Sequence, residues 1–325
     1  SNYGFYLGAT NDNLEAVKSV DSSLTCGVKI FMGASTGNML VDNTATLEGI
    51  FAATSLLVAT HCESTPMILE AEAAATAKWG EDIPFSEHPN IRSVEACYAS
   101  SSLAVGLARK HGTKLHVLHL TTAKELDLFD TGPIESKRIT AEACVHHLFF
   151  NSDDYAEKGA LIKCNPAIKT PTDQAALLKA VIEDRIDVIA TDHAPHTWEE
   201  KGRKYSTAPA GLPLVQHAII SLLDRVTDGT FSIEQIVHKT AHAPAILYQV
   251  AERGFIREGY FADLILVSPD SEHVEMPILS KCGWSPFEGH KFSHRIDKTW
   301  VNGHLRYTDG AVQPGPFGQA LTYHR

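Results

Sequence analysis

Short apolar segments recur along the first part of the chain and alternate with longer segments of helical periodicity. Several apolar segments are continuous runs without alternating polar positions, as expected of strands buried on both faces. Strands that alternate with helices predict a parallel sheet covered by helices, either an open sheet or a barrel. The expected strands are Tyr3–Gly8, Gly27–Met32, Leu56–Thr60, Leu115–Leu120, Lys137–Cys144 and Ile186–Ala190, and the expected helices are Asn13–Val20, Asn43–Ala53, Pro66–Trp79, Ser93–His111 and Pro171–Glu183.

The pattern changes after a long helix that we expect over Ile233–Val250, with Ser232 and Gln235 in capping-box spacing at its start. Short strand-like segments with turn residues between them follow, at Gly254–Ile256, Ala262–Val267 and Lys298–Leu305. We therefore predict an α/β domain over residues 1–252 and a small C-terminal β part over residues 253–325.

The composition indicates a folded chain that acts on a small molecule. Of 325 residues, 44% are hydrophobic and 21% are charged, which is ordinary for a globular protein. The formal net charge is −11 and no run of Lys or Arg offsets it, which argues against nucleic acid or an anionic membrane surface as partner. The longest apolar stretch, Ile50–Thr60, is shorter than the ~20 residues that span a bilayer.

Six cysteines are scattered along the chain without a C-x-x-C pair, so neither a disulfide scaffold nor a zinc knuckle is indicated. A reducing cytoplasm is therefore the expected location. The chain begins Ser1-Asn2 without an initiator Met, inside a strand-like segment, from which we expect a truncated start.

Ionisable side chains stand at the ends of four expected strands. Lys29 lies in an apolar run, where an amine is costly unless it is paired, modified or ligating. His61, His119 and Asp192 each follow an apolar run, and Asp192 opens the segment Asp-His-Ala-Pro-His. A single His of this kind is more often structural. Strand ends of one barrel meet at one face, however, and imidazole and carboxylate are good zinc ligands, so the four together predict a metal site.

The order and surroundings of these four residues resemble the amidohydrolase superfamily, and within it the dihydroorotases. The similarity extends over most of the chain and includes the segments Val28–Leu40, Lys163–Lys169 and Cys282–Gly289. The resemblance implies a TIM-type (β/α)8 metal-dependent hydrolase barrel with a small C-terminal β-sandwich part. The implied activity is the reversible hydrolysis of dihydroorotate to N-carbamoyl-aspartate in pyrimidine synthesis, and a homodimer is left open.

The resemblance also implies roles for individual residues. Lys29, carboxylated by carbon dioxide, would bridge two Zn²⁺ ions. His61 and His119 would complete the second metal site, and Asp192 would bind the first and act as the catalytic acid and base. The substrate would be held by four residues at the same end of the barrel, Asn165, His196, Ala210 and Gly211.

The neighbouring His146 and His147 also suggest metal binding. We expect them on a strand, where adjacent side chains point to opposite faces, so that at most one of them faces the site. A packing or supporting role is therefore the favoured interpretation.

The chain departs from the resemblance in one respect, because amidohydrolases of this type open with a His-x-His pair and this sequence contains none. The first metal site then keeps only Lys29 and Asp192, and we expect the 325-residue chain alone to bind metal poorly and to lack turnover. Two alternatives remain: a hydantoinase or allantoinase, and a non-catalytic dihydroorotase-like scaffold.

Overall fold

The computed structural model describes residues 1–33, 39–41, 43–270, 277–315 and 317–325, so residues 34–38 of the segment Val28–Leu40 lie outside the description. Its main layer is a parallel sheet of six strands, each paired with the next along the chain. This sequential order is that of a (β/α)8 barrel. The six expected strands and the α/β class are confirmed: β1 (Phe5–Gly8), β2 (Thr25–Phe31), β3 (Val58–His61), β4 (Leu115–Val117), β5 (Ile139–Cys144) and β6 (Val188–Ala190).

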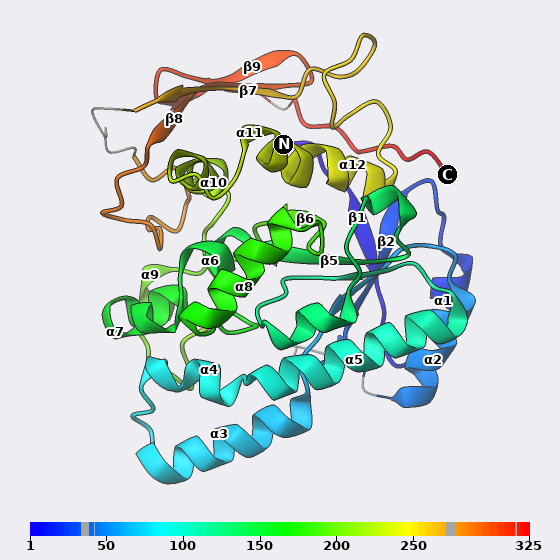
Figure 1. Cartoon of the computed structure of the whole chain (residues 1–325), viewed down its shortest axis with the longest axis vertical. Coiled ribbons are helices and arrows are strands. Elements are labelled where there is room, and N and C mark those ends of the chain that lie inside the picture. Colours follow the sequence, from blue (N-terminus) through cyan, green and yellow to red (C-terminus); the bar gives the residue numbers. More distant parts are fainter. Residues whose placement is uncertain (34–38, 42, 271–276, 316) are drawn as a thin grey trace.

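Helices connect the strands, and those that lie below the sheet in Figure 1 include the two longest. The five expected helices are confirmed as α1 (Leu14–Ser19), α2 (Thr44–Ala53), α3 (Thr65–Trp79), α5 (Val94–His111) and α8 (Pro171–Ile182). Further helices are α4 (His88–Ile91), α6 (Val145–Phe149), α7 (Tyr155–Lys158), α9 (Trp198–Lys201) and α10 (Ala218–Thr227). Single 3₁₀ turns are η1 (Phe85–Glu87), η2 (Lys124–Leu128), η3 (Ile134–Ser136), η4 (Ser152–Asp154) and η5 (Gly159–Ile162).

The long helix expected over residues 233–250 is divided. It consists of α11 (Ile233–Val237), a π-helical turn η6 (His238–His242) and α12 (Ala243–Tyr248). Pro244 at the start of α12 has no N–H to donate to the preceding turn, and a wider π turn accommodates that loss. The capping box of Ser232 and Gln235 at the start of α11 is confirmed.

A four-stranded antiparallel sheet lies above α10, α11 and α12 in Figure 1, on the side opposite α3 and α5. Its strands are β7 (Leu264–Pro269), β8 (His294–Val301), β9 (His304–Thr308) and β10 (Ala311–Val312). The segment 254–256 was expected to be a strand, which is wrong. Gly254 has φ +82° and approaches the backbone of Ala241 in η6. The chain therefore turns back here onto the helical segment that precedes it.

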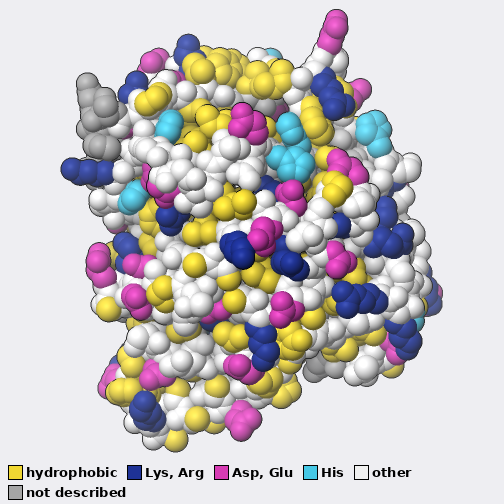
Figure 2. Space-filling view, viewed as in Figure 1, with side chains coloured by type: hydrophobic (Ala, Val, Ile, Leu, Met, Phe, Trp, Pro, Cys, Tyr) yellow, Lys and Arg dark blue, Asp and Glu magenta, His cyan; other side chains and the backbone are white. Residues whose placement is uncertain are grey.

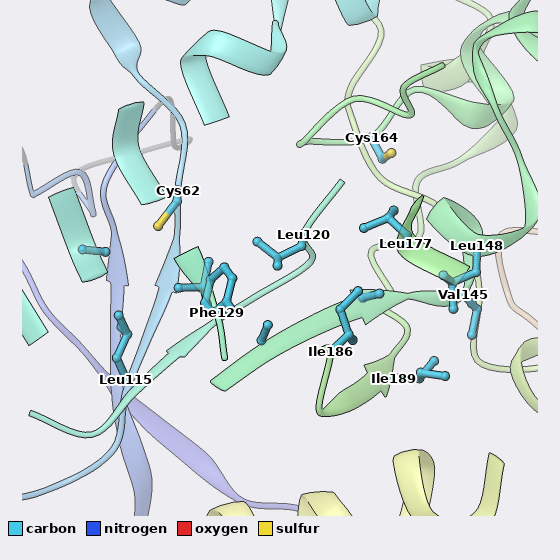
Figure 3. Close-up of a cluster of buried hydrophobic side chains, with 14 of the residues drawn as sticks. Cys62, Leu115, Leu120, Phe129, Val145, Leu148, Cys164, Leu177, Ile186 and Ile189 are labelled. Carbon is cyan, nitrogen blue, oxygen red and sulfur yellow. The ribbon is translucent and has the colours of Figure 1, made fainter. Parts of the chain in front are cut away.

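The hydrophobic core lies between the parallel sheet and its helices (Figure 3). Leu115 of β4 and Ile189 of β6 contribute from the sheet, and Leu177 contributes from α8. Val145 and Leu148 of α6 join the same cluster, so this short helix is fixed to the core directly after β5. The core thus holds the C-terminal ends of the strands in place.

Charged side chains of both signs are interspersed over the face drawn in Figure 2, while hydrophobic ones gather at its upper edge, where Figure 1 places β7 and β9. Leu264, Ile265 and Leu266 of β7 are among the exposed apolar side chains. Among the described residues, no helix is both long and apolar enough to cross a membrane.

Candidate metal centre

Four side chains predicted as metal ligands come from the C-terminal ends of β2, β3, β4 and β6. Lys29 lies in β2, where it pairs with Ala59 of β3, and His61 is the last residue of β3. His119 follows the end of β4 by two residues, and Asp192 follows the end of β6 by two residues. Parallel pairing therefore brings all four to the same edge of the sheet, which is the edge where barrels of this kind carry their chemistry.

The two histidines are in direct contact. Nδ1 of His61 lies 3.1 Å from Nε2 of His119, and both side chains are buried. Burial lowers the pKa of His119 well below its ordinary value, and His61 and Lys29 lower it further, so this imidazole is neutral. Two nitrogens bound to one zinc ion at 2.0–2.1 Å in tetrahedral geometry stand about 3.3 Å apart. The spacing of the pair therefore fits a shared metal ion.

A buried carboxylate supports the second nitrogen of His61. Glu63 is fully buried, and its Oε2 lies 2.9 Å from Nε2 of His61 and also accepts a hydrogen bond from Arg92. Burial raises the pKa of Glu63, but Arg92 and then His61 outweigh it and leave the value at about 2. Glu63 is therefore ionised and directs Nδ1 of His61 toward His119. A carboxylate behind a histidine is the usual support of a metal ligand.

Lys29 loses its proton more readily than an ordinary lysine. Its ammonium nitrogen lies 4.6 Å from the centroid of the Phe31 ring. Burial lowers its pKa to about 8, although Asp192 and Glu142 partly offset this effect. Because only the neutral amine can form a carbamate, a lowered pKa makes a larger fraction reactive near neutral pH.

Asp192 and His119 share an unusual backbone conformation, with φ values of +48° and +41°. Both lie in the left-handed region, which side chains other than glycine seldom adopt and which is frequent at functional sites. Asp192 is exposed as a residue. The surrounding protein nevertheless desolvates its carboxyl group, which raises the pKa, and the charge of Glu142 raises it further. Lys29 and His61 act in the opposite direction. The four predicted ligands thus interact electrostatically.

The donor set fits zinc. It offers two imidazoles, one carboxylate and one amine that a carbamate would convert into an oxygen ligand. Nδ1 of His119 is buried and has no hydrogen-bond partner among the described residues.

The predicted substrate residues also lie together. Nε2 of His196 is 3.2 Å from the carbonyl oxygen of Ala210. Gly211 has φ +142°, and a Cβ atom there would lie 2.5 Å from the carbonyl oxygen of Ala194 and 3.1 Å from His196. Only glycine allows this approach. Oδ1 of Asn165 is buried and has no hydrogen-bond partner among the residues that the structure describes, so it is available to a ligand.

Lys201 supports this region, a role that no sequence pattern indicated. Its side chain is almost completely buried, and its ammonium group donates hydrogen bonds to the carbonyl oxygens of Lys163, Pro209 and Gly211 at 3.0–3.2 Å. Gly211 in turn donates its N–H to the carbonyl of Lys163 at 2.9 Å. Lys201 therefore joins the backbone segments that carry Asn165, Ala210 and Gly211.

His146 and His147 do not lie on a strand, as the sequence led us to expect, but in a helix. β5 ends at Cys144, and both histidines belong to the first turn of α6. Their rings are buried, with centroids 4.0 Å apart. Successive residues of a helix are separated by about 100° rather than by the 180° of a strand, so both side chains can be buried on one side.

We expect Glu63→Gln to weaken zinc binding by about 10- to 100-fold, the usual effect of losing a carboxylate behind a metal-binding histidine. It also leaves Arg92 without its buried carboxylate, which lowers the free energy of unfolding by about 3–5 kcal/mol. Because the pKa of Glu63 lies below its ordinary value, at about 2, this stability is present above the ordinary value and is lost as the pH falls toward 2.

The measurements are competition with a chromogenic zinc chelator and urea denaturation at several pH values. Glu125→Gln is the matched control, because Glu125 is also buried but accepts its hydrogen bonds from the hydroxyl groups of Ser101 and Thr122. An equal loss of zinc affinity in both variants would mean that Glu63 does not orient His61.

Comparisons with known proteins point to one family. The model of the Amidohydrolase family matches residues 42–306. Dihydroorotase from Halobacterium salinarum is 32% identical over 287 residues, which cover 87% of this chain and 65% of the relative. Allantoinase from Bacillus velezensis is 28% identical over 316 residues, which cover 94% of this chain and 69% of the relative. The chain thus spans about two thirds of the length of these relatives.

The fold is also similar to that of solved cyclic amidohydrolases. L-Hydantoinase from Arthrobacter aurescens superposes with a TM-score of 0.87 over 99% of this chain and 73% of its own, at 22% sequence identity. At that identity the match establishes the shared architecture, and the chemistry depends on the residues at the strand ends.

Proposed function

Because the chain belongs to the amidohydrolase family, we propose that the protein is a zinc-dependent hydrolase of cyclic amides whose substrate pair is dihydroorotate and N-carbamoyl-aspartate. One observation carries the proposal: the contact of His61 with His119 at the sheet edge that also bears Lys29 and Asp192. Sequence relatives favour dihydroorotate over other cyclic amides, since the Halobacterium salinarum dihydroorotase is 32% identical.

Lys29 as a carbamate, His61 and His119 would hold one zinc ion, and Lys29 and Asp192 would contribute ligands to a second. When bound, such a pair polarises the amide carbonyl and makes a water molecule acidic enough to attack at neutral pH. The protein's own contribution is to fix three of these side chains before the substrate arrives. Glu63 does this for His61, and the left-handed backbone does it for His119 and Asp192.

Asp192 would move the proton. As a carboxylate it accepts a proton from the attacking water, and as a carboxylic acid it returns that proton to the ring nitrogen that leaves. Its raised pKa favours this exchange, because the protonated form is then less costly at neutral pH. In the reverse direction the same carboxyl group takes a proton from the attacking nitrogen as the ring closes.

His196, Asn165 and the backbone around Ala210 and Gly211 would hold the substrate. The buried amide oxygen of Asn165 can accept a hydrogen bond from a ring N–H. His196 already lies against the carbonyl of Ala210, so the two can orient one ligand together. Lys201 fixes the backbone on which this pocket wall is built.

The alternative substrate class is hydantoin or allantoin. It is favoured by the allantoinase relative, whose match covers 94% of this chain. The non-catalytic alternative is favoured by the absence of a His-x-His pair from this sequence.

The deciding experiment measures ring opening by the full-length protein, loaded with zinc, on dihydroorotate, hydantoin and allantoin at equal concentrations. We expect kcat/KM for dihydroorotate to exceed the other two by at least about 100-fold, because a site built around substrate hydrogen bonds rejects analogues that leave its polar groups unpaired. A preference for either other substrate would support the alternative class. Zinc-loaded protein that turns over none of the three substrates would support the non-catalytic scaffold.

A further inference from the structure

A cluster of three side chains at the start of α6 has no role in the proposed reaction. Cys144 ends β5, and His146 and His147 follow it in the first turn of the helix. One ligand atom from each of the three lies within 4.8 Å of the others, and all three side chains are buried. We propose that Cys144, His146 and His147 bind a transition-metal ion, most suitably Zn²⁺, at a site whose ligands differ from those of the site formed by Lys29, His61, His119 and Asp192.

Hydrogen bonding determines which nitrogen of His147 is free. Its Nε2 lies 3.1 Å from the carbonyl oxygen of Pro166, and a carbonyl only accepts, so the ring proton sits on Nε2. Nδ1 then carries the lone pair, and it has no partner among the described residues. A histidine that donates one N–H to a backbone carbonyl and keeps the other nitrogen free has the usual arrangement of a metal ligand.

His146 provides the second independent observation. Both of its ring nitrogens are buried, and neither has a hydrogen-bond partner within the part of the chain that the structure describes. Leaving a buried polar group unpaired is destabilising, so an imidazole without any partner is unusual. A bound metal ion would satisfy one of the two nitrogens, because it takes up the lone pair of the unprotonated one.

The protonation states of His146 and His147 favour the binding of a metal cation. Burial holds the pKa of His146 well below its ordinary value and that of His147 at about 3, so both imidazoles are neutral and their lone pairs are available. Burial, followed by Glu142 and Asp192, raises the pKa of the Cys144 thiol. A metal ion would reverse this effect: the thiol proton leaves for solvent and the sulfur binds as thiolate.

The chain's local geometry builds the cluster. The change from strand to helix at Val145 brings residues 144, 146 and 147 together, and the Val145 and Leu148 side chains fix the turn to the core (Figure 3). A thiolate with two imidazoles suits zinc better than magnesium or calcium, which prefer oxygen. Three protein ligands leave one position open.

The test uses cobalt in place of zinc. A thiolate bound to Co²⁺ absorbs in the near ultraviolet through sulfur-to-cobalt charge transfer, and the other proposed site offers only nitrogen and oxygen ligands. We expect this band in the full-length protein refolded with Co²⁺, because a fully buried site fills as the chain folds. Cys144→Ser should remove the band and one equivalent of cobalt, whereas Cys282→Ser, at a partly exposed cysteine, should change neither.

Cys164→Ser tests the assignment of the sulfur, because Sγ of Cys164 lies 3.8 Å from Nε2 of His147. Absence of the band from the wild-type protein, or loss of the band in Cys164→Ser but not in Cys144→Ser, would overturn the proposal.

If Cys144→Ser does not fold, X-ray absorption of zinc-loaded Lys29→Ala, whose other site is disabled, should still show one sulfur at about 2.3 Å from zinc. Zinc-free Lys29→Ala would contradict the proposal. None of these results depends on hydrolytic activity.

Discussion

Replacing Asp192 with asparagine in the full-length protein is expected to reduce kcat for dihydroorotate by about 100- to 10,000-fold, the range over which a positioned general acid and base contributes. Asparagine keeps the size of the side chain and tolerates the left-handed backbone at this residue, where φ is +48°. It cannot accept the proton from water or return it to the leaving nitrogen. The variant should therefore fold normally and lose the chemical step.

Asp184→Asn is the matched control. Asp184 is also an aspartate with positive φ, at +54°, but it lies beyond the end of α8, where it pairs with Lys239. We expect its kcat to stay within about twofold of wild type. Steady-state kinetics and zinc content should be measured on both variants. Normal turnover by Asp192→Asn would remove Asp192 from the proposed mechanism.

The second large effect concerns Lys29. We expect Lys29→Ala to lose most of its zinc and its activity, because the carbamate would be a ligand of both ions. The pKa of Lys29 is lowered to about 8, so enough neutral amine is present near neutral pH to take up carbon dioxide. A carbamate then replaces a costly buried ammonium with an anion that the metal ions stabilise.

Carbon-13 NMR of protein prepared with labelled bicarbonate and zinc measures this directly. Wild-type protein should show one carbamate resonance, which Lys29→Ala should lack. Lys201→Met is the matched control, because Lys201 is also buried with a pKa lowered to about 8, but backbone carbonyls surround its ammonium group. Loss of the resonance in Lys201→Met, together with its persistence in Lys29→Ala, would show that Lys201 carries the carbamate and that the assignment to Lys29 is wrong.

The sequence predicted the sheet well because several strands are continuous apolar runs and all six alternate with segments of helical periodicity. Apolar periodicity also predicted the longer helices of the first 182 residues, which are α1, α2, α3, α5 and α8. Helix α10 was missed, although Ile220, Leu222 and Leu223 are buried on its inner side. One-turn helices such as α6 leave too few residues to show a period, which explains why His146 and His147 were expected on a strand.

The site was predictable only as far as its residues follow strands. Lys29, His61, His119 and Asp192 could be chosen because barrel strands end at one face. The support of His61 was not visible, since Glu63 is ionised through Arg92, which is 29 positions away in the sequence. The contacts of Lys201 similarly join segments that no local pattern connects.

The proposed function requires a metal ion between the strand ends that carry Lys29, His61, His119 and Asp192. Anomalous diffraction on both sides of the zinc absorption edge, from crystals of the full-length protein grown with zinc and bicarbonate, tests it most directly. We predict a zinc peak at about 2.0–2.1 Å from Nδ1 of His61 and Nε2 of His119, with carbamate density on Lys29 beside it. Zinc-loaded crystals with no anomalous peak there, and with the two imidazoles hydrogen-bonded to each other, would contradict the claim.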